Sequence, residues 1–346
     1  VQHSPHIHGP DLCAHGAGKP CGKGGTFIKA GVVDENCKVV AKASIPSAVD
    51  GNDEALAGRM VECAQKALAE LNLTIDDIES VGVGTPGAVD VKTGTVIYSC
   101  NLQFENTPLA QYVEDRIHKA VYLENDANVA AYGEAIAGAA KGISDVIMIT
   151  LGTGVGGGII IDGKIYSGFN GIGGELGHIV IDYNGRDCAC GRKGCLEAYA
   201  SASALVKMTQ EAMEANPQSK LWEVAKTLDE VNGKTAFDAM RMGDETGKKL
   251  VDDYISYLGC GLSNFVNIFQ PEVLLIGGGI CKEGETLLAP LREILKTETY
   301  GLENTARTTL KGILARIYKR DLFVARGQFI KIHRMRGLDS QDEWLQ

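Results

Sequence analysis

The sequence predicts an α/β protein with two domains. Segments with the alternating pattern of strands and segments with the helical period follow one another between residues 26 and 151, as is typical of the α/β class. A second observation is the short apolar strand expected at residues 272–276, which leads directly into three glycines. The third is length, because 346 residues are enough for two domains of about 150 residues each.

Hydrophobic spacing and turn residues place the individual elements. Asp53 is expected to cap a helical stretch in which Leu56, Met60 and Leu68 recur on one face. Residues 201–269 are mostly helical in pattern. The other expected elements are, in chain order, strands at 26–33 and 38–45, the apolar segment 80–84, a helix at 109–117, a strand at 121–124, a helix at 127–137 and a strand at 146–151.

Composition indicates an acidic, soluble protein of the cytoplasm. The chain has a formal net charge of −10, 45% apolar residues and a mean hydropathy of −0.03. No uncharged apolar run reaches the ~18 residues of a membrane helix, and the start of the chain lacks the apolar stretch of a secretory signal. Three of the ten cysteines lie within eight residues, and the other seven favour a reducing compartment over a disulfide framework. We therefore expect no membrane partner.

Both ends of the chain differ in composition from the middle. Residues 1–23 hold four of the seven histidines and little apolar periodicity, so we expect disorder there. Residues 307–336 carry nine Lys or Arg and one acid, Asp321, for a local charge of +8. A basic tail can contact nucleic acid, but this one has no known nucleic-acid-binding motif. We expect a solvated tail and no nucleic-acid partner.

One imidazole and three thiols gather within eighteen residues. They belong to His178, Cys188, Cys190 and Cys195, and glycines between them permit tight turns. This donor set suits a tetrahedral Zn²⁺ ion, and four protein ligands leave no open position, so the expected site is a structural zinc knuckle. The alternative is three unrelated thiols near a histidine.

Two carboxylates flank the predicted zinc site. Glu175 lies three residues before His178, and Glu197 lies two residues after Cys195. A closed zinc site would hold both carboxylates rigidly, because it fixes the loop between them. Carboxylates placed in this way can accept hydrogen bonds from the hydroxyl groups of a sugar.

A short internal repeat marks two glycine-rich turns. Gly25-Thr26 and Gly152-Thr153 are each followed by a glycine six positions after the first, then by two apolar residues and a turn. Two such hairpins facing each other would form a phosphate clamp from backbone N–H groups and hydroxyls, because glycine lets the backbone approach the phosphate oxygens. The alternative for residues 152–158 is a purely structural hairpin turn.

Asn125 and Asp126 stand where a predicted strand ends and a helix begins. One of the two is expected to be the N-cap of that helix. Asp126, at the carboxyl end of a strand, is also placed to be a general base that takes the proton of an attacking hydroxyl group. Neither role excludes the other.

Six motifs occur in a characteristic order: TPG at 85–87, LENDAN at 123–128, LGTGVGGG at 151–158, GGELGH at 173–178, CACGRKGCLE at 188–197 and GGG at 277–279. In this order they resemble the ROK family of repressors, open reading frames and sugar kinases, and most of all its bacterial ATP-dependent glucokinases. The resemblance covers residues 24–305. It implies a two-domain actin-like fold of the ribonuclease H type, with ATP in an interdomain cleft. It places a small α/β domain at 24–119 and a large α/β domain with the zinc site at 120–306, between an atypical N-terminal segment, 1–23, and an atypical basic tail, 307–346.

The resemblance also implies roles for single residues. Asp126 matches the family's catalytic base, and it lies among the positions that match sugar contacts, which are Gly87, Asn101, Asn125, Glu175, His178 and Glu197. The positions that match nucleotide-binding segments are Gly25, Thr26, Gly152, Thr153, Gly154, Gly278 and Gly279. The implied reaction transfers the γ-phosphoryl group of ATP, with Mg²⁺, to the 6-hydroxyl of a hexose, with glucose as the expected sugar. The family also implies a homodimer or homotetramer.

The chain departs from the family pattern at its ends. The family has a Mg²⁺-organising aspartate at the end of an apolar first strand, whereas Gly22 stands at that position here, and the family's C-terminal helix is missing after Leu310. We therefore expect weak kinase activity. The alternatives are an impaired sugar-binding protein, or a kinase for N-acetylmannosamine, N-acetylglucosamine or fructose. A repressor is disfavoured because too few residues precede Gly24 for a helix-turn-helix domain.

Overall fold

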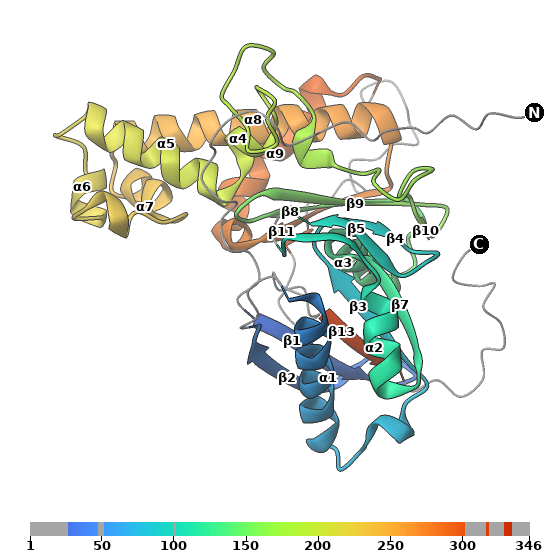
Figure 1. The fold of residues 1–346 in the computed structure, drawn as a ribbon. Coiled ribbons are helices and arrows are strands. Elements are labelled where there is room, and N and C mark those ends of the chain that lie inside the picture. The colour runs from blue at the N-terminus through green and yellow to red at the C-terminus, as the bar shows by residue number, and fades with distance from the viewer. Residues whose placement is uncertain (1–26, 48–51, 100–101, 302–315, 318–328, 334–346) are drawn as a thin grey trace, which may run out of the picture.

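The computed structural model describes residues 27–47, 52–99, 102–301, 316–317 and 329–333. Strands and helices alternate along these residues, so the predicted α/β content is confirmed. The strands form two five-stranded sheets and one three-stranded sheet. In Figure 1 the two larger sheets lie one above the other, with α3 (Asp126–Ala137) between them.

The first sheet runs in the order β2-β1-β13-β3-β7. Its strands are β1 (Phe27–Val33), β2 (Val39–Pro46), β3 (Ser80–Thr85), β7 (Ala120–Asn125) and β13 (Phe329–His333). β1 is antiparallel to β2, and β3 is parallel to β7. β13 lies between β1 and β3, parallel to the first and antiparallel to the second. Our expectation of a solvated tail is therefore wrong for β13, because this segment completes a sheet.

Two helices pack on the first sheet. α1 (Asp53–Ala69) contacts β1 and β2, and α2 (Leu109–Ile117) contacts α1 and β7. The apolar face predicted for α1 is buried there. The N-cap of α1 is Asn52, whose side chain accepts a hydrogen bond from the backbone N–H of Ala55 at 2.8 Å. The prediction of Asp53 as the cap is wrong by one residue, because Asp53 is already the first residue of the helix.

A three-stranded antiparallel sheet follows β3 directly. Its strands are β4 (Ala88–Asp90), β5 (Thr95–Ser99) and β6 (Phe104–Thr107). We did not predict it from the sequence, because strands of three to five residues are too short to show a clear alternation. The turn between β3 and β4, which leads into this short sheet, lies beside the start of α3.

The second large sheet runs in the order β10-β9-β8-β11-β12. Its strands are β8 (Val146–Leu151), β9 (Val155–Ile161), β10 (Lys164–Ile165), β11 (Val273–Gly278) and β12 (Arg316–Ile317). β8 and β9 form an antiparallel hairpin, and β11 runs parallel to β8. β12 pairs with β11, so a second part of the expected tail also belongs to a sheet.

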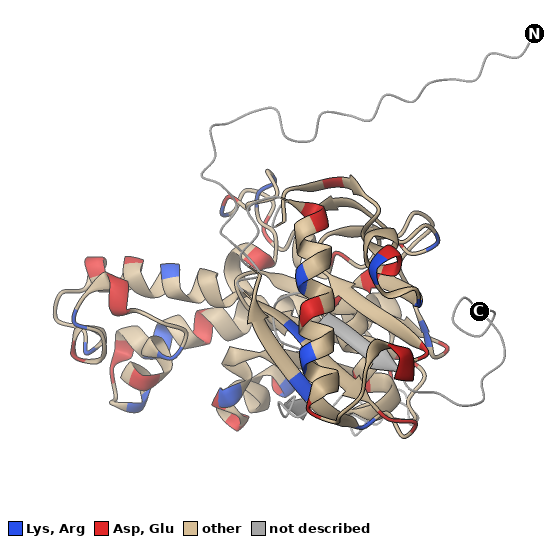
Figure 2. Cartoon of the chain, turned by 60° about the horizontal axis from the view of Figure 1, so that its bottom comes forward, with Lys and Arg blue, Asp and Glu red and all other residues tan. Residues whose placement is uncertain are grey.

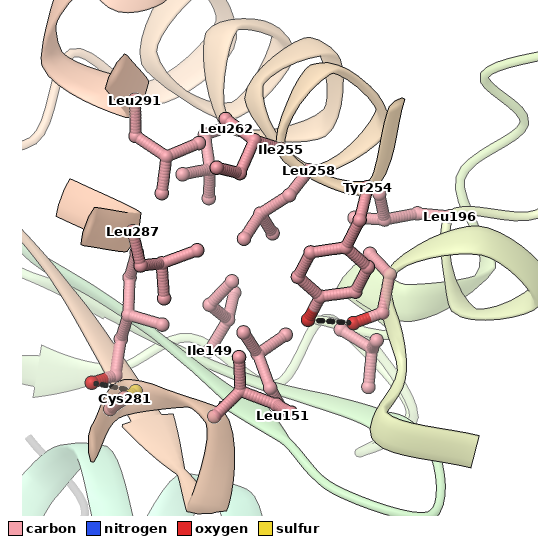
Figure 3. Packing of buried hydrophobic residues seen from close by; sticks show 14 of the residues in the cluster. Ile149, Leu151, Leu196, Tyr254, Ile255, Leu258, Leu262, Cys281, Leu287 and Leu291 are labelled. Carbon is pink, nitrogen blue, oxygen red and sulfur yellow. Dashed lines mark hydrogen bonds between the residues drawn. The ribbon is translucent and has the colours of Figure 1, made fainter. Parts of the chain in front are cut away.

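A helical region packs on one face of the second sheet and extends beyond the sheet on one side (Figure 1). Its helices are α4 (Glu197–Ala200), α5 (Ala202–Ala215), α6 (Leu221–Val224), α7 (Thr235–Arg241), α8 (Glu245–Phe269) and α9 (Glu285–Glu298). The short 3₁₀ turns are η1 (Ile75–Asp77), η2 (Leu176–His178), η3 (Leu228–Glu230) and η4 (Gly279–Glu283). The buried core lies between α8, α9 and the strands, and Figure 3 shows Leu258 and Leu291 in the same cluster as Ile149 and Leu151.

Acidic and basic residues are interspersed along the helices (Figure 2). On α8, for example, Lys248 pairs with Asp252 and Lys249 with Asp253, each at 2.6 Å. The basic stretch 307–336 is described only at β12 and β13. Within the described ranges, no helix combines the length and the apolar character needed to cross a membrane.

Candidate functional site

Asp126 is the first residue of α3 and directly follows β7. Asn125 is the N-cap of α3, and its Oδ1 accepts hydrogen bonds from the backbone N–H groups of Ala127 (2.9 Å) and Asn128 (3.3 Å). The capping role left open by the sequence therefore belongs to Asn125. The cap does not need the carboxylate of Asp126, which leaves that carboxylate for another role.

The turn between β3 and β4 is tied to this helix start. Nδ2 of Asn125 donates a hydrogen bond to the carbonyl oxygen of Gly87 at 3.0 Å. Gly87 has a φ of +112°, and a Cβ at this position would lie 2.4 Å from the carbonyl oxygen of Tyr98. Because no other residue type fits that space and conformation, glycine at position 87 keeps the turn in contact with Asn125.

The charge environment of Asp126 favours its protonated form. Burial raises the pKa of the Asp126 carboxyl, and the negative charge of Glu175 raises this pKa further. The backbone N–H groups of Asp126 and Ala127 lower the pKa in part. A carboxylate whose pKa is raised accepts a proton more readily, as a general base near neutral pH must do.

Glu175 connects Asp126 with residues 178–195, which carry the predicted metal ligands and which we call the cysteine-rich loop. Its backbone carbonyl accepts a hydrogen bond from the N–H of His178 at 3.0 Å. Burial raises the pKa of the Glu175 carboxyl, His178 lowers this pKa, and the charge of Glu197 raises it. The structure therefore brings Asp126, Glu175, His178 and Glu197, which come from three separate motifs, into one electrostatic cluster.

The four predicted metal ligands lie together. The ligand atoms of His178, Cys188, Cys190 and Cys195 are all within 4.8 Å of one another. Nδ1 of His178 is 3.7 Å from Sγ of Cys188, and Sγ of Cys190 is 3.7 Å from Sγ of Cys195. Burial raises the pKa of the Cys188 and Cys195 thiols. This group, which we call the Cys/His cluster, could hold a metal ion.

Two glycine-rich turns follow the ends of β8 and β11 in the second sheet. Gly152–Gly154 joins β8 to β9, and Gly278 and Gly279 stand where β11 ends. In the parallel pairing of β8 with β11, Gly278 is opposite Leu151, so both turns follow the carboxyl ends of neighbouring strands. Gly278 has a φ of +106°, and a Cβ there would lie 2.0 Å from the carbonyl oxygen of Leu151. Backbone N–H groups in turns at the carboxyl ends of parallel strands can bind phosphate.

Three predicted site residues, Gly25, Thr26 and Asn101, lie outside the described residues. Gly25 and Thr26 form the predicted second half of the phosphate clamp, so the clamp as a pair of facing hairpins stays a prediction. Asn101 follows Ser99, the last residue of β5, by two positions, and its predicted sugar contact also stays a prediction.

Glu124 and Asn128 complete the start of α3, and neither was assigned a role from the sequence. Oε1 of Glu124 accepts hydrogen bonds from Nδ2 of Asn128 at 3.0 Å and from the backbone N–H of Asn125 at 2.7 Å. Burial raises the pKa of the Glu124 carboxyl, and these two donors lower it in part. Both residues belong to the LENDAN motif, but Glu124 is in a strand and Asn128 is in a helix, so no periodic spacing indicates the contact.

Comparison with known proteins places these motifs in a family. A sequence model described as the ROK family matches residues 22–318. This match extends beyond residue 307, where we expected the atypical tail to begin. A glucokinase of Thermotoga maritima is 38% identical over 274 residues, which cover 78% of this chain and 84% of the relative. A glucokinase of Halalkalibacterium halodurans is 34% identical and covers 82% and 86% of the two chains.

Among solved structures, a ROK family glucokinase from Streptomyces griseus in complex with glucose and AMPPNP superposes with a TM-score of 0.68. It is 32% identical, and the superposition covers 85% of this chain and 93% of that chain. The fold described above is therefore that of a ROK protein over most of its length.

Proposed function

The chain belongs to the ROK family, and from this premise we propose that it transfers the γ-phosphoryl group of ATP to the 6-hydroxyl of glucose. The relatives named glucokinase, and the relative solved with glucose and AMPPNP, support this substrate pair. The observation that carries the proposal is the position of Asp126, which starts a helix without capping it and whose half-buried carboxyl feels the negative charge of Glu175.

In the proposed reaction, the carboxylate of Asp126 accepts the proton of the sugar 6-hydroxyl. As that proton leaves, the hydroxyl oxygen forms a bond to the γ-phosphorus, and the bond between the γ-phosphorus and the bridging oxygen of ADP breaks. Burial near Glu175 raises the pKa of Asp126, which favours proton uptake by this carboxylate. The products are glucose 6-phosphate and ADP.

Side chains around Asp126 would position the sugar. Asn125 uses one Nδ2 proton on Gly87 and retains a second for a sugar hydroxyl. The carboxylates of Glu175 and Glu197 are acceptors for further hydroxyls, and His178 offers the ring nitrogen that does not face Cys188. Asn101 and the backbone at Gly87 complete the proposed set.

Backbone N–H groups of the glycine-rich turns would bind the ATP phosphates. The proposed nucleotide contacts within the described residues are Gly152, Thr153, Gly154, Gly278 and Gly279, with Gly25 and Thr26 as the opposite side of the clamp. Mg²⁺ bound with ATP supplies neutralisation of the phosphate charge during transfer. An actin-like cleft between domains at 24–119 and 120–306 is the proposed frame for both substrates.

We propose that the Cys/His cluster holds a structural Zn²⁺ ion. Ligand atoms at the corners of a tetrahedron with Zn–S bonds of about 2.3 Å lie about 3.8 Å apart. The 3.7 Å separation of the Cys190 and Cys195 sulfurs supports this geometry. All four corners are protein atoms, so the ion would fix the loop that carries Glu197 and take no part in phosphoryl transfer.

Two alternatives compete with this function. A sugar-binding protein with little kinase activity is favoured by Gly22, which stands where the family has its Mg²⁺-organising aspartate. A kinase for N-acetylmannosamine, N-acetylglucosamine or fructose would use the same side chains, because they contact hydroxyls common to these sugars. A homodimer or homotetramer in the cytoplasm is the proposed cellular form.

A coupled phosphorylation assay with these four sugars, alongside calorimetry of sugar binding, separates the candidates. We expect phosphorylation with the highest kcat/KM for glucose, at a modest rate. Glucose binding without turnover would support the impaired protein, and preference for another sugar would change the substrate. Failure to bind any of the four sugars would contradict the proposed site.

A further inference from the structure

Glu197 lies between the Cys/His cluster and the glycine-rich turn Gly152–Gly154. It is the first residue of α4, two residues after Cys195. Its Oε2 accepts a hydrogen bond from the backbone N–H of Val155 at 2.9 Å, and its Oε1 lies 3.8 Å from Sγ of Cys188. One carboxylate therefore contacts both the Cys/His cluster and the residue at which β9 begins.

The turn is fitted closely around this carboxylate. A Cβ at Gly154 would lie only 2.2 Å from Oε2 of Glu197. On the other side of the turn, the carbonyl oxygen of Gly152 accepts a hydrogen bond from the backbone N–H of Ala202 at 2.7 Å. Residues 197–202 thus hold both sides of the turn, and a shift of this segment must shift the turn as well.

The helix that carries Glu197 is itself anchored. Leu196 is fully buried against α8, where a Cβ at Gly261 would lie 2.5 Å from its side chain. The buried Tyr254 hydroxyl donates a 2.9 Å hydrogen bond to the carbonyl oxygen of Ala200 (Figure 3). α4 is therefore fixed to α8 at both ends, and Cys195 fixes the residue before Leu196 within the Cys/His cluster.

We propose that Glu197 is a positioning residue that couples the Cys/His cluster and the sugar site to the phosphate-binding conformation of Gly152–Gly154. The identity of the nucleotide rests on the function proposed above. Because Glu197 is also one of the proposed sugar contacts, sugar binding at this carboxylate and nucleotide binding at the turn share one side chain. Such coupling is reciprocal, so glucose should tighten nucleotide binding by the same factor by which the nucleotide tightens glucose binding.

Hydrogen exchange at the Val155 amide tests the link without any turnover. Glu197→Ala removes the acceptor of this amide, and we expect exchange at least ~10-fold faster than in the unmodified protein. Glu197→Gln keeps an acceptor oxygen and should retain most of the protection. Removal of metal by a chelator should also accelerate exchange at Val155. Glu211→Ala is the matched control, because Glu211 pairs with Arg186 of the cysteine-rich loop and has no contact with the turn in the described structure.

Binding of AMPPNP with and without glucose gives the functional measurement. In the unmodified protein we expect glucose to lower the dissociation constant of AMPPNP by about 5-fold or more. Glu197→Ala should abolish this effect, and Gly154→Ala should weaken it with Glu197 intact, because the new Cβ displaces the carboxylate. Unchanged Val155 exchange in Glu197→Ala, or full coupling in that variant, would overturn the inference. If AMPPNP does not bind the unmodified protein, the proposed function fails, and Val155 exchange still decides the role of Glu197.

Discussion

The side-chain amide of Asn125 joins the start of α3 to the turn at Gly87 through a 3.0 Å hydrogen bond. The same amide caps α3 through its Oδ1, so one side chain fixes the helix start and the turn that faces it. This relationship holds the first helical residue, Asp126, at a defined place relative to the first sheet. The predictions below begin with this contact.

Replacement of Gly87 by alanine should disrupt the contact. The substitution places a Cβ 2.4 Å from the carbonyl oxygen of Tyr98 at a φ of +112°. Gly163→Ala is the matched control, because Gly163 also has a positive φ, +75°, but no atom lies within 4 Å of its ideal Cβ. We expect Gly87→Ala to lower the free energy of unfolding by about 1–3 kcal/mol more than the control, and to weaken glucose binding. Equal unfolding free energies in urea would show that the turn adapts and that Gly87 has no special role.

Asp126→Asn should separate catalysis from sugar binding. The amide keeps the hydrogen-bonding shape of the carboxylate but cannot accept the sugar proton, so kcat should fall by a factor on the order of 10² or more. The dissociation constant for glucose, measured by calorimetry, should change by no more than a few fold. A parallel loss of binding and rate would instead assign Asp126 to the structure of the helix start.

Metal binding should depend on Cys190, which belongs to the Cys/His cluster, and should not depend on Cys260, an exposed cysteine outside it. Cys190→Ser removes one of four ligand atoms and should lower metal affinity at least ~10-fold. Because the same loop carries Glu197, glucose affinity should fall with the metal content. Cys260→Ser changes an exposed thiol outside the cluster and should leave both quantities unchanged. The absence of zinc from reduced, folded protein in elemental analysis would contradict this prediction and the zinc assignment.

Glu134 should make the protein less stable as the pH rises. Its side chain is buried and accepts a hydrogen bond from the N–H of Ala139 at 2.6 Å, and burial raises the pKa of its carboxyl. The folded protein therefore binds this proton more tightly than the unfolded chain, and stability is lost as pH rises through the raised pKa. Glu134→Gln keeps an acceptor without the charge, so it should be more stable than the unmodified protein at pH 8.

The advantage of Glu134→Gln should shrink as the pH falls toward the ordinary glutamate pKa of 4.5. Thermal unfolding of both proteins between pH 8 and pH 5 measures this difference. Glu35→Gln, on the exposed turn after β1, serves as the control in the same buffers. A stability difference that stays constant across this range for Glu134→Gln would refute the assignment of a buried, titrating carboxyl.

Much of the fold could be predicted because its signals are local. The helix at 109–117 and the strand at 146–151 have the bounds expected from their apolar patterns. The Cys/His cluster was predictable because its four ligands are close in sequence. By contrast, the contact between Glu197 and Val155 joins residues 42 positions apart through a backbone N–H, which leaves no mark in composition or spacing. β13 was missed for the same reason, since its pairing with β1 is long-range and parallel.

The place of β13 determines how the missing aspartate at position 22 could be restored. Both edges of β1 are paired in the described sheet, one with β2 and the other with β13, where Ala30 is opposite Ile330. A new apolar strand placed before Gly24 would pair with β1 as a hairpin. It therefore needs the edge that β13 holds.

We expect Gly22→Asp alone to restore little activity, because residues 1–21 lack the apolar pattern of a strand that would position the new carboxylate for Mg²⁺. Replacing residues 1–23 with an apolar strand that has an aspartate at position 22 should raise kcat substantially only when the chain also stops before Phe329. With a chain that stops after His333, β13 remains and should compete with the new strand, so the gain should be smaller. Hydrogen exchange at the backbone amides of β13, such as that of Ile330, would report whether β13 is still paired. If the unmodified protein already phosphorylates glucose at ~10 s⁻¹ or faster, an aspartate at position 22 is not required, and another carboxylate must serve the metal.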